Sequence, residues 1–188
     1  MISGSKVLLR MPEKEDLEFV YDLANAEENR QFVGIYRPMF KKEEEDWITS
    51  TMQKAANGTD YVFIIIDKKT KRPIGNCGIH GIDPISRYGR IGIHPKLQNK
   101  GCGTDAIKAI LKFGFESLNL HIIYISAIEN NKRAIHLYKE KLKFRYEATL
   151  RDRHYKNGRY LGEIVFSMTK DEWEKLYKQG RIHGTKRA

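Results

Sequence analysis

The feature that constrains the fold most is a strand-like segment joined to a helix-like segment by a glycine-rich turn. Residues 87–95, "RYGRIGIHP", are rich in β-formers and end at a proline, which is typical of a β-strand. Gly101 and Gly103 follow, and apolar residues then recur at helical spacing over 104–117. A strand, a turn and a helix in succession favour an α/β fold, in which helices cover a sheet.

The same turn has a chemical meaning. A helix N-terminus exposes unpaired N–H groups and the positive end of the helix dipole, so it attracts anions. Glycine lets the backbone turn tightly and lets a phosphate approach closely, and Lys100 adds positive charge. The turn therefore predicts a phosphate cradle, although such a turn also occurs as a plain connection. It is neither a P-loop, since GxxxxGK[ST] is absent, nor a Rossmann fingerprint, since GxGxxG fails at Ile107.

The rest of the chain alternates between short apolar runs and amphipathic segments. Helices are expected at 11–25, 41–57, 104–117, 131–142 and 170–178. Strands are expected at 6–10, 60–67, 74–82, 87–95, 121–128, 144–150 and 160–168. The pattern predicts a mixed α/β sheet of about seven strands with helices on both faces. We expect a single domain over 1–188, with its core at about 6–168 and a C-terminal helix and basic tail at 170–188.

Composition excludes several classes of protein. Hydrophobic residues make up 40% and charged residues 31% of the chain, a balance typical of a globular protein. The longest apolar run, "YVFIII", is far shorter than the roughly 18 residues of a membrane span, and "MISGSKVLLR" does not resemble a signal peptide. Cys77 and Cys102 lack disulfide or zinc spacing, and the histidines show no HxH or HExxH pattern. We therefore expect a cytoplasmic protein without a metal or a membrane partner.

The chain is strongly basic, with a net charge of +10 and an isoelectric point of about 9.5. Such a charge attracts nucleic acid, a membrane surface or a small polyanion. Lysine and arginine are concentrated at 139–160, but they are not arranged with aromatic residues as in a known nucleic-acid module. A nucleic-acid partner is therefore not favoured, and a basic surface with a partner and a merely solvated one both stay open.

Two segments resemble one enzyme family. The segment "QNKGCG" at 98–103 resembles the Q/R-x-x-G-x-G/A signature of the GNAT family of acetyl-CoA-dependent N-acetyltransferases. The segment at 129–144 resembles that family's Asn, Ala, Tyr, Gly-Phe segment, with Lys143 where the family usually has glycine. The expected order of elements also agrees over nearly the whole chain. Within the family, the branch of spermidine and ribosomal-protein N-acetyltransferases is the most similar.

The resemblance implies where a cofactor binds. It implies a central sheet that is splayed in the middle, so that acetyl-CoA enters between two strands. The pyrophosphate of coenzyme A would lie on the backbone amides of the turn, and the pantetheine arm beside the preceding strand. The implied cofactor-binding residues are Ile91, Gly92, Ile93, Gln98, Asn99, Lys100, Gly101, Cys102, Gly103, Thr104 and Asn131.

The resemblance also implies a mechanism, in which the acceptor amine attacks the thioester directly, without a covalent enzyme intermediate. Tyr138 matches the residue that gives a proton to the departing thiolate, and its alternative role is that of a packing aromatic. Asn131 matches a residue that caps a helix or contacts the cofactor, and Asn is a favoured N-cap. A nucleophilic Cys102 is not favoured, because the sequence places no histidine beside it.

The general base is left open by the sequence. Relatives often carry an acid at the positions of Arg90 and Gly162, so two acidic positions near the acceptor are absent here. The remaining candidates are a water relay and four side chains, namely His80, Asp83, His94 and Glu163.

The acceptor is expected to contact the irregular segment at 29–40 and the hairpin at 151–160. The notable side chains there are Arg30, Phe32, Tyr36, Arg37, Arg153, His154 and Tyr155, which are equally explained as core cover and solvated charge. The loss of acids predicts a peptide N-terminus or an amino acid-like amine as acceptor. A polyamine or amino sugar is the alternative, and a non-catalytic acyl-CoA-binding or RNA-associated module is the alternative of another class. A homodimer is also open.

Overall fold

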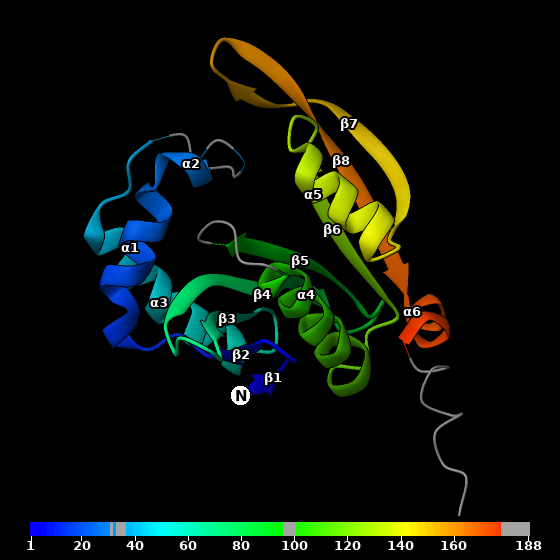
Figure 1. Ribbon diagram of the computed structural model, residues 1–188, viewed down its shortest axis with the longest axis horizontal. Helices are drawn as coiled ribbons and strands as arrows, with labels where there is room; N and C mark the ends of the chain where they lie inside the picture. The colour runs from blue at the N-terminus through cyan, green and yellow to red at the C-terminus, as the bar shows by residue number, and fades with distance from the viewer. Residues whose placement is uncertain (31, 33–36, 96–100, 178–188) are drawn as a thin grey trace, which may run out of the picture.

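A single eight-stranded sheet forms the centre of the protein, in the order β1-β2-β3-β4-β5-β6-β8-β7 (Figure 1). The structure, a computed structural model, describes residues 1–30, 32, 37–95 and 101–177. The strands are β1 (Ile2–Ser3), β2 (Val7–Arg10), β3 (Tyr61–Asp67), β4 (Pro73–Asp83), β5 (Tyr88–Pro95), β6 (Ile122–Ile128), β7 (Arg145–Lys156) and β8 (Arg159–Thr169). Neighbouring strands are antiparallel except β5 and β6, which are parallel. The predicted mixed sheet is confirmed, and the two-residue β1 adds an eighth strand to the seven expected.

Among the described residues, five helices fall close to the predicted positions, and the four-residue helix at 27–30 was not predicted. They are α1 (Leu17–Asn25), α2 (Glu27–Arg30), α3 (Lys41–Ala56), α4 (Cys102–Lys112), α5 (Lys132–His136) and α6 (Lys170–Tyr177), with a 3₁₀ turn η1 (Lys14–Asp16). Two π-helical turns, η2 (Phe113–Ser117) and η3 (Leu137–Lys141), continue α4 and α5. Within the described ranges, the structure has no helix that is both long and apolar enough to cross a membrane. The predicted basic tail beyond α6 lies outside these ranges.

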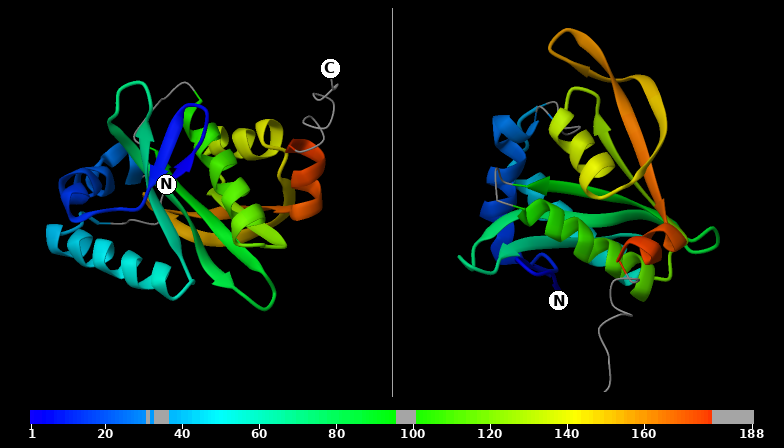
Figure 2. Two further views of the ribbon diagram at one scale, coloured as in Figure 1. Left: turned by 90° about the horizontal axis from the view of Figure 1, so that it is seen from below. Right: turned by 45° about the vertical axis from the view of Figure 1, so that its right-hand side comes forward.

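The alternation of side chains along β3 explains why helices cover both faces of the sheet. Phe63 and Ile65 belong to the main core, which also contains the buried face of α4. Ile64 lies between them and packs on the other face with Val20 of α1 and Ile48 of α3. Figures 1 and 2 show α1 and α3 on one side of the sheet and α4 and α5 on the other. Helices on both faces are therefore confirmed.

The two parallel strands separate in the middle of the sheet. Their ladder runs from Tyr88 opposite Ile122 to Ile91 opposite Ile125 and ends there. Both strands continue beyond this point, β5 to Pro95 and β6 to Ile128, but no further β5–β6 pair exists among the described residues. The helix α4 lies over the β4–β5 side of the separation and α5 over the β6–β8 side (Figure 1). The sheet therefore has the splay that the family resemblance implied.

The β7–β8 hairpin is longer than the sequence predicted. We expected the first strand to end at residue 150, but β7 continues to Lys156 through a register irregularity between Leu150 and His154. Asp152 lies inside this irregularity with a positive φ of 55°. The segment is charged and mostly exposed, so no apolar alternation marks it as a strand. At the tip, the Lys156 ammonium donates a hydrogen bond to the Arg30 carbonyl of α2.

Candidate active site

A cleft of about 620 Å³ lies on the sheet face opposite α4. Tyr88 and Arg90 point into it, because they alternate along β5 with Ile91, which belongs to the α4-side core. Tyr88, Arg90 and Tyr124 belong to the paired part of β5 and β6, so the cleft lies beside the point where the two strands separate. Its lining residues are His80, Gly81, Tyr88, Arg90, Tyr124, Ala148, Leu150 and Val165.

His80 is held at this cleft by a carboxylate. Its Nδ1 lies 3.2 Å from Asp60 Oδ2, and the Gly81 N–H donates to Asp60 Oδ1 at 3.0 Å. The ammonium of Lys54 lies 3.9 Å from Asp60 Oδ2. Because an ionised carboxylate only accepts hydrogen bonds, we assign the proton to Nδ1 and the lone pair to Nε2. His80 and Asp60 therefore form a histidine–carboxylate pair whose free nitrogen is Nε2.

A pair of glycines makes room for the imidazole. Gly78 of β4 lies opposite Gly92 of β5 in the ladder, and both share a sheet face with His80. A Cβ at Gly78 would lie 3.1 Å from His80 Nε2, and a Cβ at Gly92 would lie 3.2 Å from the same atom. The free nitrogen of His80 therefore lies over Gly92, one residue beyond the last β5–β6 pair.

The other two base candidates on β4 and β5 have different surroundings. Burial lowers the pKa of His94, and the nearby His80 lowers it further, so His94 is neutral at neutral pH. Asp83 accepts hydrogen bonds from the Ile85 and Ser86 N–H groups at 2.9 and 2.7 Å, which fixes the turn between the two strands. Asp83 therefore serves the turn.

Glu163 is a buried acid with two arginines and a histidine around it. Its side chain accepts a hydrogen bond from the Ser126 hydroxyl. Nitrogens of Arg90, Arg153 and His154 lie 3.9, 3.6 and 3.5 Å from its carboxylate oxygens. Arg90, at a position where relatives often carry an acid, is thus partly balanced by the acid that this chain retains.

The helix that follows the predicted cradle begins at Cys102, two residues earlier than expected. Gly101 is the N-cap of α4, with a φ of 95° in the left-handed region, so a side chain there would strain the turn. Gly103 lies in the first turn of α4 with an ordinary φ, and no described atom lies within 4 Å of where its Cβ would stand. Thr104 lies in the same turn, whereas Gln98, Asn99 and Lys100 lie outside the described residues.

The N-terminal segment is fixed beside this turn. The Asp105 carboxylate accepts hydrogen bonds from the backbone of Ser5, Lys6 and Val7 at 2.7 to 3.0 Å, and from the Ser5 hydroxyl at 2.7 Å. The Lys6 ammonium lies 3.0 Å from the position that a Cβ at Gly101 would take. Sequence reasoning missed Lys6, because about a hundred residues separate it from the turn and no local pattern connects them.

Neither cysteine has the environment of a nucleophile. Cys102 is buried, and burial, with a smaller effect of Asp67, raises the pKa of its thiol. Cys77 is buried in the sheet, where desolvation also raises the pKa. Both therefore remain protonated thiols at neutral pH.

Tyr138 lies in the π-helical turn η3 and is only 5% exposed. Its ring centroid lies 6.4 Å from that of Phe144 and 6.1 Å from that of Phe166. Burial raises the pKa of the phenol, so Tyr138 keeps its proton over the working range of pH. The packing role is confirmed, and it leaves a protonated hydroxyl for a second role.

The structure explains two positions of the segment at 129–144, which resembles the second family motif. Asn131 is the N-cap of α5, and its Oδ1 accepts a hydrogen bond from the Ala134 N–H at 3.1 Å, so the capping role is confirmed. Lys143 has a φ of 63°. This left-handed conformation favours glycine, which is why the family usually has glycine there.

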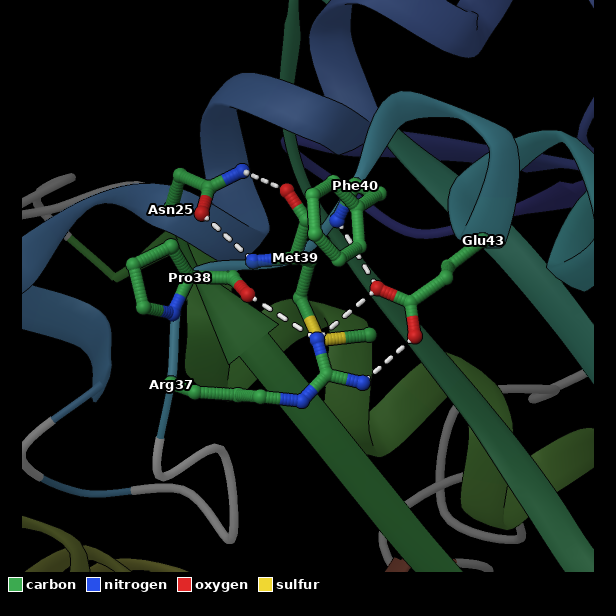
Figure 3. A network of polar contacts seen from close by, with 6 residues as sticks. All are labelled: Asn25, Arg37, Pro38, Met39, Phe40 and Glu43. Atoms are coloured by element: carbon green, nitrogen blue, oxygen red, sulfur yellow. Dashed lines mark hydrogen bonds and ion pairs between the residues drawn. The ribbon is translucent and has the colours of Figure 1, made fainter.

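The residues at 37–40 are tied to the helices around them (Figure 3). Arg37 forms a fork with Glu43 of α3 at 2.9 and 2.5 Å, and this contact lowers the pKa of Glu43 to about 2. Asn25 of α1 bonds the backbone of Met39 through both its amide atoms. Arg37 therefore anchors the chain to α3.

The other predicted acceptor residues are only partly accounted for. Phe32 is 38% exposed, and Tyr155 pairs with Tyr160 on the hairpin at a centroid distance of 5.1 Å. Arg153 and His154 face Glu163, as described above, while Tyr36 lies outside the described residues. No described group of three or more His, Cys, Asp or Glu side chains is placed to hold one metal ion.

Known proteins share this sequence and architecture. Residues 6–145 match the family described as Acetyltransferase (GNAT) domain. Spermidine N(1)-acetyltransferase of Escherichia coli strain K12 is 30% identical over 174 residues, covering 87% of this chain and 86% of that enzyme. The putative ribosomal N-acetyltransferase YdaF of Bacillus subtilis strain 168 is 30% identical over 102 residues, 53% of this chain and 55% of that protein.

A solved structure agrees over almost its whole length. The crystal structure of spermidine N-acetyltransferase from Vibrio cholerae in complex with CoA and spermine has a TM-score of 0.79 and 27% identity, covering 90% of this chain and 99% of that one. The motifs, the splayed sheet and these similarities lead to one conclusion. The chain belongs to the GNAT family of acetyltransferases.

Proposed function

We propose that this protein transfers the acetyl group of acetyl-CoA to a primary amine that stands beside a neutral or acidic group. The observation that carries the proposal is the cleft beside the splay, in which Arg90 is the only permanently charged side chain among the described lining residues. The relatives named for acetyl transfer, one of them in complex with CoA and spermine, support the reaction and the co-substrate.

The cofactor side of the splay fits a pantetheine arm and a phosphate. Beyond Ile91, the edge of β5 that faces β6 has no ladder partner among the described strands, so Gly92 and Ile93 can pair with an extended ligand. The open space over Gly103 suits the close approach of a phosphate to the amides of the α4 N-terminus. The ammonium of Lys6 adds positive charge at Gly101.

The reaction balances with the residues at hand. The neutral amine nitrogen attacks the thioester carbonyl, the new C–N bond forms, and the C–S bond breaks with its electron pair left on sulfur. The Tyr138 hydroxyl donates a hydrogen bond and then its proton to that sulfur, because burial has kept the phenol protonated. The nitrogen releases one N–H proton to solvent, the tyrosine regains a proton from solvent, and the products are the N-acetylated amine and the free thiol.

The charge of the cleft selects the acceptor. None of the eight described lining residues carries a carboxylate, and the nearby Glu163 already faces Arg90 and Arg153. Arg90 is 55% exposed, so its guanidinium can pair with an acidic group of the acceptor. A polyamine would bring several positive charges next to that guanidinium, which is repulsive. Peptide N-termini and amino acid-like amines are therefore favoured over spermidine and spermine.

The polyamine alternative rests on the relatives' names rather than on this cleft. Thiol release from acetyl-CoA, measured with purified protein and a panel of dipeptides, amino acids, amino sugars and polyamines, tests the proposal. We expect the fastest turnover with acidic or neutral α-amines. Fast turnover of spermidine with inert α-amines would contradict the acceptor proposal, and acetyl-CoA binding without turnover of any amine would contradict the activity.

A further inference from the structure

The group that accepts the proton of the attacking amine has not yet been identified in this site. A primary amine binds largely as an ammonium ion at neutral pH, and it must lose a proton before or while it attacks the thioester. The two positions where relatives often carry an acid hold Arg90 and Gly162 in this chain. Some other group must therefore accept the proton.

We infer that His80 is the general base of this enzyme and that Asp60 is its positioning residue. The inference rests on the acetyl transfer proposed above. His80 lines the cleft, and its Nδ1 is engaged by Asp60 at 3.2 Å, which leaves Nε2 as the proton acceptor. Nε2 lies over Gly92, at the first residue of β5 beyond the ladder with β6.

The surroundings of His80 agree with this role. The charged and titratable groups that face it are Asp60 and, behind it, Lys54, together with Arg90 and His94 of β5 and the hydroxyls of Tyr88 and Tyr124 across the cleft. Asp60 is the only carboxylate among these, and it contacts the nitrogen that does not face the ligand. Asp60 therefore stabilises the cationic imidazole that forms during the reaction. The Asp60 carboxylate already contacts the His80 ring before the proton is transferred.

The other candidate bases are occupied elsewhere. Asp83 accepts two backbone hydrogen bonds in its turn, and Glu163 is enclosed by Ser126, two arginines and His154. His94 lies near His80 on the same face, but no described carboxylate holds its ring. Of the four candidate bases, only His80 both lines the cleft and has its ring held by a carboxylate.

The proton balance is simple. An acceptor that arrives as an ammonium ion first passes one proton through His80 Nε2 to solvent. As the neutral amine nitrogen then forms its bond to the acetyl carbon, a second N–H proton moves to His80 Nε2. The electron pair of the C–S bond stays on sulfur, which takes a proton from Tyr138. His80 then releases its proton to solvent, and Tyr138 takes one back, so the enzyme returns to its starting state.

The experiment compares His80→Gln with His121→Gln, an exposed histidine outside the cleft, using the best acceptor of the panel. We expect kcat of the His80 variant to fall about 10²-fold or more, with unchanged acetyl-CoA affinity in calorimetry, and the His121 variant to match the wild type. In His80→Ala, added imidazole should restore kcat at least about tenfold, which a structural defect would not allow. Asp60→Asn should shift the acid limb of the profile of kcat against pH.

Unchanged kcat in His80→Gln would overturn the inference, and so would a loss found in His94→Gln alone. If the His80 variants do not fold, ¹⁵N NMR of the wild-type protein decides, because the inference requires the Nδ1–H tautomer and an Nε2–H tautomer would refute it. Inactivity of the wild type with every amine would contradict the proposed function instead, so the two failures are distinguishable.

Discussion

Gly103→Ala separates cofactor binding from protein stability, because the two should change in opposite directions. Gly103 lies in the first turn of α4 without the positive φ that makes Gly101 necessary, and no described atom lies within 4 Å of the added methyl group. Alanine is favoured over glycine in a helix by about 0.5–1 kcal/mol. We therefore expect a small gain in stability, about 1 to 4 °C in Tm for a domain of this size.

The same methyl group would occupy the space through which we propose that a phosphate reaches the α4 amides. Displacing the phosphate from one charge-assisted hydrogen bond removes about 1.5–3 kcal/mol, or at least about tenfold in Kd. Calorimetric titration with acetyl-CoA measures this loss. Acetyl-pantetheine, which lacks the nucleotide phosphates, should bind the variant and the wild type equally.

Gly101→Ala is the matched contrast. Its φ of 95° makes an added Cβ cost about 1–2 kcal/mol of stability, so this variant should lose both stability and affinity. If Gly103→Ala gained stability and still bound acetyl-CoA as tightly as the wild type, the phosphate would not approach this turn and the reasoning would be refuted.

Four further variants test other parts of the account. Tyr138→Phe should lower kcat about 10²-fold with little change in acetyl-CoA affinity, measured by single-turnover kinetics and calorimetry. Arg90→Glu should shift kcat/KM toward cationic amines and away from acidic ones in the thiol-release assay. Lys143→Gly should raise the free energy of unfolding by about 0.5–1 kcal/mol in urea titrations, because the left-handed φ of 63° strains lysine. Asp105→Asn should weaken the loss of stability in acid, measured as Tm against pH.

The prediction for Asp105→Asn follows from the linkage between protonation and folding stability. Burial raises the pKa of Asp105, but its hydrogen bonds to the Lys6, Ser5 and Val7 segment outweigh burial and lower the pKa overall. The stabilisation is therefore present above the ordinary carboxyl pKa of about 4 and disappears as pH falls through the lower folded value. Identical acid profiles of the variant and the wild type would contradict this.

Each of the other three also has a contradicting result. Wild-type turnover in Tyr138→Phe under chemistry-limited conditions would leave that residue a packing aromatic only. Arg90→Glu should differ from Arg72→Glu, an exposed control in the turn between β3 and β4, and equal acceptor preferences in the two would remove Arg90 from the acceptor site. A destabilised Lys143→Gly would mean that glycine's flexibility in the unfolded chain outweighs the relief of strain.

Much of the fold could be predicted because its signals are local. The helical spacing after Gly103 and the β-rich run at 121–128 identify their elements without knowledge of partners. The short β1 was missed because two residues carry no periodicity, and the extension of β7 because its side chains are charged and exposed.

The chemistry of the cleft was predicted less well, for a physical reason. His80 was one of four candidate bases, and only the strand register places it over Gly92 and only the contact with Asp60 fixes its proton. Arg90 was identified only as the loss of an acidic position, but it lies beside Glu163, which is distant in sequence and reaches it across β6. Such pairs depend on tertiary packing, which no local pattern encodes.

The most direct test of the central claim is amide hydrogen exchange with and without acetyl-CoA. We propose that the ligand lies between the separating strands and over the first turn of α4. Protection on binding should therefore be greatest at residues 92–94 and 101–104, while the β2–β3 ladder should change little. Protection confined to other elements, or no protection at saturating acetyl-CoA, would contradict this placement of the active site.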